Sequence, residues 1–399
     1  MGTRLDVAEL RGWGRLAFDA TLGVTAVVEG MHHNIARGPW FLDAPRSART
    51  RGLTGLVYGA VRGVTRLAGE GWDAALSRAA GGAGQASSPR REAVRAALNG
   101  VLGDHLVATG NPLAIPMQLR FGGRPVALER RALRDAIPGA TGKVVVLVHG
   151  LCTDPLRWRR RGHDHGAALA RDLGYTPLYL HYNSGLHVST SGRGLDEVLE
   201  ALVRAWPVQL EDLSLLGHSL GGLVARSACR QGAAAGHAWP RRLRSAVFLG
   251  TPHHGAPLER GGNWVDVVLG VSPYTAPLAN LGRIRSAGIT DLRHGNVLEE
   301  DWRGRDRFAR SPDRRRPVPL PPGVRCLAVA GTTARGRSAA ADLLGDGLVP
   351  LASALGRHRD PARTLAFGPA GRAIAPGVGH LDLLGDPGVY ARVRGWLAG

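Results

Sequence analysis

The sequence predicts an α/β fold, in which a mostly parallel sheet is flanked by helices, with a cap insertion and an N-terminal helical extension. Two patterns predict it. From about residue 144 onward, short apolar runs alternate with helix-like stretches, as in successive βαβ crossovers. Residues 1 to about 80 instead carry apolar residues at helical spacing. We therefore expect a helical extension over residues 1–110 and an α/β domain over residues 112–399.

The extension contains two apolar stripes, one from Val24 to Ile35 and one from Leu53 to Leu67. Such a stripe packs on a neighbouring helix or on the main domain, lies on a membrane surface, or gates a substrate. The sequence leaves these alternatives open. Residues 81–89 (GGAGQASSP) are typical of a linker, and a further helix is expected from Arg90 to about Val107.

The α/β domain is expected to begin with a hairpin, which gives the sheet an antiparallel start. Met117–Phe121 and Pro125–Leu128 form its strands around the glycine pair at 122–123. The later strand candidates are Val144–Val148, Pro177–His181, Leu213–Leu216, Ala246–Leu249, Cys326–Ala330 and Thr364–Phe367. The expected helices between and after them include Ala167–Leu173, Gly194–Trp206, Leu220–Gln231 and Pro387–Leu397.

An insertion over about residues 256–322 interrupts this alternation. It contains an apolar segment and then a stretch rich in arginine and proline. Its place in the order puts it over the carboxyl edge of the sheet, where α/β folds bind ligands. We expect a cap or lid. Trp264, Val268 and Tyr274 would line a substrate pocket, bury the cap against the body, or do both.

The composition weighs against nucleic acid as a partner. The net charge of +19 suggests an anionic partner, but Lys143 is the only lysine among 51 basic residues. Such arginine excess, with abundant alanine and glycine, is typical of a GC-rich genome, and the charge is dispersed. Three cysteines without a C-x-x-C pair fit a reducing compartment. Charged residues interrupt the N-terminus, so neither a signal peptide nor a membrane span is expected there. We expect a cytoplasmic protein, with peripheral membrane contact through the N-terminal helices left open.

The strongest chemical signal is the G-x-S-x-G pattern at residues 217–221, directly after an apolar strand and before a helix. A serine hydroxyl is a poor nucleophile near neutral pH, so it must be exposed beside a base. A sharp strand-to-helix turn presents Ser219 in this way. Its backbone crowds its neighbours, and the residues Gly217, His218 and Gly221 form the elbow around it.

A second signal supplies oxyanion donors. Val144–Val148 is a buried strand that ends in His149-Gly150-Leu151. Acyl transfer needs two N–H donors for the tetrahedral intermediate: one after the nucleophile, here Leu220, and one after an earlier strand, here Leu151. His149 itself fits a hydrogen-bonded loop anchor better than a catalytic base. No metal-ligand spacing, dinucleotide fingerprint or P-loop stands out, and no cofactor or metal is expected.

With these motifs the chain resembles the α/β-hydrolase superfamily, in its bacterial lipase and esterase branch. It is also similar to the esterase domain that deacylates inositol in GPI anchors. The matching elements are His149-Gly150-Leu151, Gly217–Gly222 and Gly250-Thr251-Pro252-His253-His254-Gly255. The resemblance covers about residues 112–399. It implies an acid at Asp346, within Gly345–Pro350, and a base at His380, within Gly377–Asp382.

The resemblance implies a serine carboxylic-ester hydrolase that forms an acyl-enzyme on an apolar acyl ester, either a small molecule or a lipid. In it Ser219 attacks, His380 moves the proton and Asp346 orients the imidazole. Two alternatives remain open. The same triad serves an acyltransferase, or the fold serves as a non-catalytic scaffold that binds a membrane or a partner. The sequence does not indicate an oligomeric state.

Overall fold

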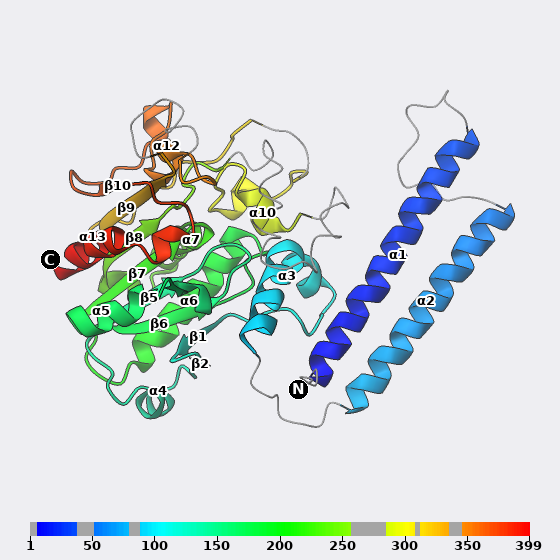
Figure 1. Cartoon of the computed structure of the whole chain (residues 1–399), viewed down its shortest axis with the longest axis horizontal. Coiled ribbons are helices and arrows are strands. Elements are labelled where there is room, and N and C mark those ends of the chain that lie inside the picture. The colour runs from blue at the N-terminus through cyan, green and yellow to red at the C-terminus, as the bar shows by residue number, and fades with distance from the viewer. Residues whose placement is uncertain (1–5, 38–51, 80–87, 257–284, 308–311, 335–344) are drawn as a thin grey trace. The chain divides into compact units, whose positions relative to one another are not determined.

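The computed structural model describes residues 6–37, 52–79, 88–256, 285–307, 312–334 and 345–399 (Figure 1). The contacts within it define two compact units. One combines residues 1–87 with 106–114, and the other combines 88–105 with 115–399. The expected boundary at residue 110 stays a prediction. Most of the helix before that residue, Pro89–Ala108, groups with the second unit. Each unit is described separately.

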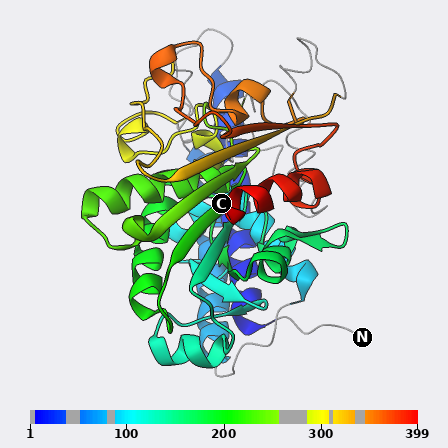
Figure 2. The same ribbon diagram turned by 90° about the vertical axis from the view of Figure 1, so that its left-hand side faces the viewer.

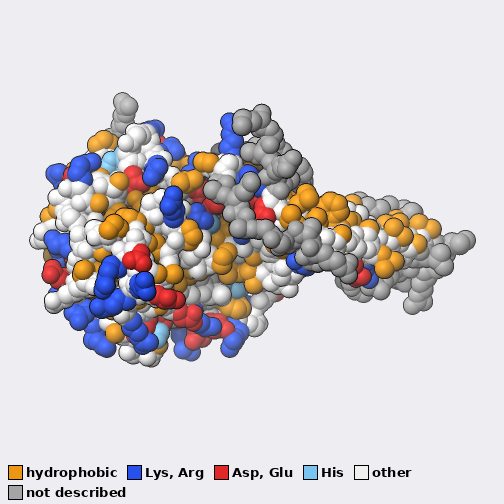
Figure 3. Space-filling view, turned by 90° about the horizontal axis from the view of Figure 1, so that it is seen from below, with side chains coloured by type: hydrophobic (Ala, Val, Ile, Leu, Met, Phe, Trp, Pro, Cys, Tyr) orange, Lys and Arg blue, Asp and Glu red, His pale blue; other side chains and the backbone are white. Residues whose placement is uncertain are grey.

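The first unit is built on a helical hairpin of α1 (Val7–Arg37) and α2 (Gly52–Ala79). Asp73 accepts hydrogen bonds from both Arg11 and Arg15, which hold the pKa of its carboxyl well below the ordinary value. The outer face of α2 is apolar: Val64 is 68% and Leu67 70% exposed, and Figure 3 shows hydrophobic side chains gathered along the hairpin. Within the described residues, neither these helices nor any other is apolar over enough length to cross a bilayer.

The second unit is built on an eight-stranded sheet with the order β10-β9-β8-β7-β3-β6-β1-β2. Strands β10, β9, β8, β7, β3 and β6 run parallel to one another. Strand β1 is antiparallel to both β6 and β2. The expected mostly parallel sheet with an antiparallel start is therefore confirmed. Its strands are β1 (Gln118–Phe121), β2 (Arg124–Pro125), β3 (Lys143–Val148), β6 (Thr176–His181), β7 (Asp212–His218), β8 (Leu243–Leu249), β9 (Arg325–Thr332) and β10 (Arg372–Pro376). The short strands β4 (Arg159–Arg160) and β5 (His163–Asp164) form a separate ribbon.

Helices cover both faces of the sheet because successive strand residues point to opposite sides. In β3, Val144, Val146 and Val148 join the cluster on the α6 and α7 side, while Val145 and Leu147 join the cluster with α5 and α13. Figure 2 shows α13 (red) and the yellow-green helix α7 on opposite sides of the sheet. In the described part of this unit the α-helices are α3 (Pro89–Ala108), α4 (Arg130–Ala136), α5 (His165–Leu173), α6 (Val188–Ala205), α7 (Leu220–Ala235), α10 (Ala287–Asp291), α12 (Leu351–Ala354) and α13 (Pro387–Ala398).

One predicted strand is wrong. Residues 364–367 form no strand, and the sheet instead ends with β10 (Arg372–Pro376). Leu365 and Phe367 are buried against Phe248, so their alternation reflects side-chain packing without a hydrogen-bonded ladder. Of the β10 residues only Ala375 is buried, as expected of an edge strand, and the strand gives a weak apolar signal. The helix expected from Gly194 also begins earlier, at Val188.

Candidate active site

Ser219 occupies the sharp turn between β7 and α7. Its backbone has φ 53° and ψ −125°, a conformation that costs a non-glycine residue about 1–3 kcal/mol. The turn is held by its own hydrogen bonds: Ser219 N donates to Leu249 O at 2.8 Å, and Gly222 N donates to Ser219 O at 3.0 Å. Ser219 is partly exposed, whereas His218 and Leu220 on either side are buried. The fold thus presents this one hydroxyl at the carboxyl edge of the sheet.

Glycines surround the turn because the backbone comes too close for a side chain. A Cβ on Gly217 would lie 2.6 Å from Cα of Gly222, and one on Gly221 would collide with the carbonyl oxygens of Val148 and His149. A Cβ on Gly150 would lie 3.1 Å from Cβ of Ser219. The loop after β3 therefore passes directly beside the serine.

Asp346 and His380 form a buried pair. His380 Nδ1 lies 2.7 Å from Asp346 Oδ2, and the other carboxylate oxygen accepts from the amides of Leu348 and Val349 at 3.1 and 2.9 Å. The backbone of His380 also donates to Asp346 O at 3.0 Å. A carboxylate accepts, so Nδ1 carries the proton and Nε2 keeps its lone pair. This tautomer can take a proton from a hydroxyl.

Residues next to the serine turn lie against the Asp346–His380 pair. Leu249 O, which binds the Ser219 amide, is followed by Gly250 with φ +56°. A Cβ on Gly250 would lie 2.9 Å from Asp346 Oδ2 and 3.1 Å from His380 Nδ1. On the other side, His218 Nε2 lies 3.1 Å from His380 O. Both neighbours of the serine turn thus touch the Asp346–His380 pair.

Sequence reasoning did not single out Gly250 or the carbonyl contact of His218. Both stand within the motifs that carry the resemblance, and the positive φ of Gly250 is the feature that a glycine there serves. Burial and the nearby His380 hold the pKa of His218 well below its ordinary value, so its ring is neutral. Because His380 O can only accept, Nε2 of His218 carries the proton.

The two expected oxyanion donors lie on either side of the serine. Leu220 begins α7, where the first N–H groups have no partner within the helix. Leu151 follows Gly150, and the structure gives neither amide an acceptor among the described residues. His149 is buried, stacks on Tyr182 at 4.5 Å, and has its pKa lowered to about 4 by burial, as befits a loop anchor. The neighbouring Cys152 is buried too, which raises the pKa of its thiol.

The loop that carries His380 is tied to the body further along. Arg160 donates to Asp382 at 2.6 Å, and His165 Nε2 lies 2.9 Å from Leu383 O. Asp386 then caps α13 by accepting from Val389 N at 2.9 Å. These contacts hold the chain that follows His380, whereas Asp346 holds the imidazole itself.

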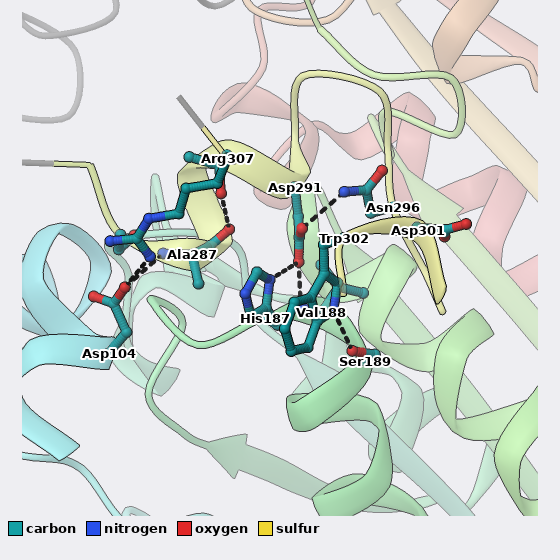
Figure 4. A network of polar contacts seen from close by, with 12 residues as sticks. Asp104, His187, Val188, Ser189, Ala287, Asp291, Asn296, Asp301, Trp302 and Arg307 are labelled. Carbon is teal, nitrogen blue, oxygen red and sulfur yellow. Dashed lines mark hydrogen bonds and ion pairs between the residues drawn. The ribbon is translucent and has the colours of Figure 1, made fainter. Parts of the chain in front are cut away.

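Trp264, Val268 and Tyr274, the expected pocket residues of the insertion, lie outside the described residues. The part of the insertion that follows is anchored to α6 (Figure 4). Asp291 accepts from His187 Nδ1 at 3.0 Å and Val188 N at 2.8 Å. Trp302 stacks on the His187 ring at 3.7 Å. Within the described ranges, no group of three histidine, cysteine or acidic side chains is arranged to hold a metal ion.

Comparison with known proteins confirms the resemblance. Residues 139–315 match the family model described as the PGAP1-like alpha/beta domain. Among solved structures, the chain is similar to the mature lipase BlEst2 of Bacillus licheniformis, with 20% identity, 67% of this chain and 92% of that chain covered, and a TM-score of 0.39. It is also similar to the esterase Pf2001 of Pyrococcus furiosus, with 14% identity, coverage of 65% and 83%, and a TM-score of 0.39. No curated protein matches the chain.

Proposed function

We propose that the chain is a serine carboxylic-ester hydrolase that acts through an acyl-enzyme, with Ser219 as the nucleophile. The observation that carries the proposal is the strained, partly exposed turn at Ser219. His218 and Gly250 lie beside this turn, and both contact the buried Asp346–His380 pair. A strained turn of this kind is retained where it serves a purpose. The match of residues 139–315 to an α/β family supports the same proposal.

In the proposed reaction Ser219 Oγ attacks the ester carbonyl while His380 Nε2 takes the hydroxyl proton. The amides of Leu151 and Leu220 donate to the oxyanion, and each such donor is worth about 10²–10³ in rate. His380 returns the proton to the departing alcohol and then activates water against the acyl-enzyme. Asp346 stabilises the imidazolium through the 2.7 Å contact to Nδ1. We also propose that the acyl group of the ester is apolar.

The test is hydrolysis of a p-nitrophenyl ester series from C2 to C16 by the wild type and by Ser219→Ala. We expect Ser219→Ala to lower kcat by roughly 10⁴-fold or more. Ser214→Ala is the matched control, because Ser214 lies on β7, the strand that leads to Ser219, where it is buried and donates to Asp212 at 2.8 Å. A fluorophosphonate should label the wild type and Ser214→Ala at Ser219. Equal activity in Ser219→Ala and the wild type, or no turnover and no labelling at all, would refute the proposal.

A further inference from the structure

Away from the serine turn, a strongly basic pocket is lined by residues of α7 and of the loop after β8. It has a volume of about 140 Å³. Its charged and polar lining includes Arg226, His253, Arg315, Arg316 and Arg363. Its apolar walls include Val297, Val318 and Leu365. All of these residues belong to the second unit.

Arg226 at this pocket is a buried cation without a carboxylate partner among the described residues. It is 5% exposed, it donates a hydrogen bond to Val318 O at 2.6 Å, and it lies 3.4 Å from His253 Nδ1. Its Nε is buried and has no hydrogen-bond partner within the described ranges. Burial lowers the pKa of Arg226 to about 10, and the charge of Arg315 adds to this effect. A buried guanidinium is normally paired with an anion.

His253 also has a buried nitrogen without a hydrogen-bond partner among the described residues. It is fully buried, and burial holds its pKa well below the ordinary value, so the ring is neutral. Its Nδ1 faces the Arg226 guanidinium, which only donates, so Nδ1 accepts and Nε2 carries the proton. That N–H has no acceptor in the part of the chain that the structure describes, although the ring packs edge-on against Phe248 and Phe367. Two buried donors at the pocket, Arg226 Nε and His253 Nε2, thus lack an acceptor among the described residues.

The other arginines do not remove the excess charge. Arg315 and Arg363 both pair with Asp313, at 2.8 and 3.0 Å. Arg315 also donates to the carbonyls of His253 and Gly295. With Arg226 and the exposed Arg316, four arginines line the pocket beside one shared carboxylate. The described lining therefore carries more positive charge than this one carboxylate balances.

We propose that this pocket binds a phosphate group, with Arg226 and Arg316 as its principal partners. Planar guanidinium groups bind phosphate oxygens through paired, charge-assisted hydrogen bonds. Two sources would supply the same chemistry: free inorganic phosphate, or a phosphate carried by the ester substrate. Arg226 lies seven residues after Ser219 on α7, roughly 10 Å along the helix axis. A single substrate can span that distance.

The first test measures binding and does not depend on ester hydrolysis. Inorganic phosphate is titrated into the full chain at constant ionic strength, and calorimetry is combined with thermal unfolding. We expect saturable binding and a rise in Tm that Ser219→Ala retains. The absence of saturable binding to the wild type would overturn the proposal. Phosphate binding by an inactive protein would leave it standing even if the proposed ester hydrolysis fails.

Variants then locate the site. Arg316→Ala removes an exposed arginine from the pocket, and Arg314→Ala removes an exposed arginine of the same segment that does not line it. We expect roughly tenfold weaker phosphate binding in the first and unchanged binding in the second. Arg226→Gln should weaken binding by a larger factor. If that variant does not fold, the matched pair of surface variants decides. Equal binding by all variants would mean an adventitious ion only and would overturn the proposal.

The source of the phosphate is read from kinetics, and this arm alone rests on the proposed function. Two p-nitrophenyl esters of equal chain length are compared, one neutral and one with a terminal phosphate. If the substrate carries the group, Arg316→Ala raises KM roughly tenfold for the phosphorylated ester alone. If free phosphate is the ligand, KM for the two esters changes equally and the calorimetric binding persists. Both outcomes support a phosphate pocket.

Discussion

Nδ1 of His380 lies 2.7 Å from Oδ2 of Asp346, and both side chains are buried, one after β9 and the other after the neighbouring strand β10. Gly250, between the serine turn and this pair, leaves no space for a methyl group. The carboxylate also accepts two backbone amides, so its orientation is set before any substrate arrives. Four predictions follow from this arrangement and from the packing around it.

Asp346→Asn should lower kcat by about 10³–10⁴-fold with little change in the fold. An amide can still accept from Leu348 N, but its NH₂ group would face Nδ1 and favour the wrong imidazole tautomer. Steady-state kinetics on a p-nitrophenyl ester measure the loss, and circular dichroism checks the fold. Asp360→Asn is the control, since Asp360 caps an exposed turn, and its activity should stay within about twofold. Activity of Asp346→Asn close to the wild type would contradict the assigned role.

Gly250→Ala should reduce both activity and stability. Its φ of +56° disfavours an alanine, and the new Cβ would lie 2.9 Å from Asp346 Oδ2 and 2.8 Å from Leu383 Cδ1. Gly236→Ala has a similar φ of +69° at the end of α7 but meets open space. It should therefore lose about 1 kcal/mol of unfolding free energy and keep its activity. If the two variants behaved alike in kinetics, the contact at Gly250 would have no bearing on the site.

Stability should fall as the pH is lowered from 7 to 5. Burial lowers the pKa of His149 and His165 to about 4 and that of His181 to about 2. In the unfolded chain these groups protonate near pH 6.5, so below that pH the unfolded state binds more protons than the folded state. Each histidine then costs up to about 1.4 kcal/mol per pH unit.

Urea unfolding at pH 7, 6 and 5 measures this dependence. His165→Gln should make it shallower, because one buried histidine no longer titrates. His105→Gln replaces an exposed histidine and should leave the slope unchanged. A stability that stays flat from pH 7 to 5 in the wild type would show that the buried histidines are not kept neutral by the fold.

Asp291→Ala should destabilise the chain by about 3 kcal/mol. Asp291 is buried and accepts from His187 Nδ1, Val188 N and Asn296 Nδ2, so its loss leaves three donors without their acceptor (Figure 4). Urea unfolding measures the change. Glu300→Ala, at an exposed neighbouring site, should change it by less than about 0.5 kcal/mol. A loss below about 1 kcal/mol for Asp291→Ala would mean that the insertion is anchored elsewhere.

Much of the fold could be predicted because buried parallel strands carry continuous apolar runs. Val144–Val148 and Leu213–Leu216 lie within β3 and β7. The prediction failed for residues 364–367, where side-chain alternation serves packing alone, and at β10, where only Ala375 is buried. A local sequence pattern indicates which side chains are buried. It does not indicate which backbone groups form hydrogen bonds with a neighbouring strand.

For the site, the sequence by itself determined the chemistry on offer: a serine between glycines after a strand, and an acid and a histidine in motifs further along. Only the tertiary structure decided that Asp346 and His380 pair at 2.7 Å, and that Gly250 and His218 touch that pair. It also placed Arg226 in a basic pocket without a carboxylate partner among the described residues. The physical reason is that motifs are local, whereas strand order in the sheet decides which distant loops meet at its carboxyl edge.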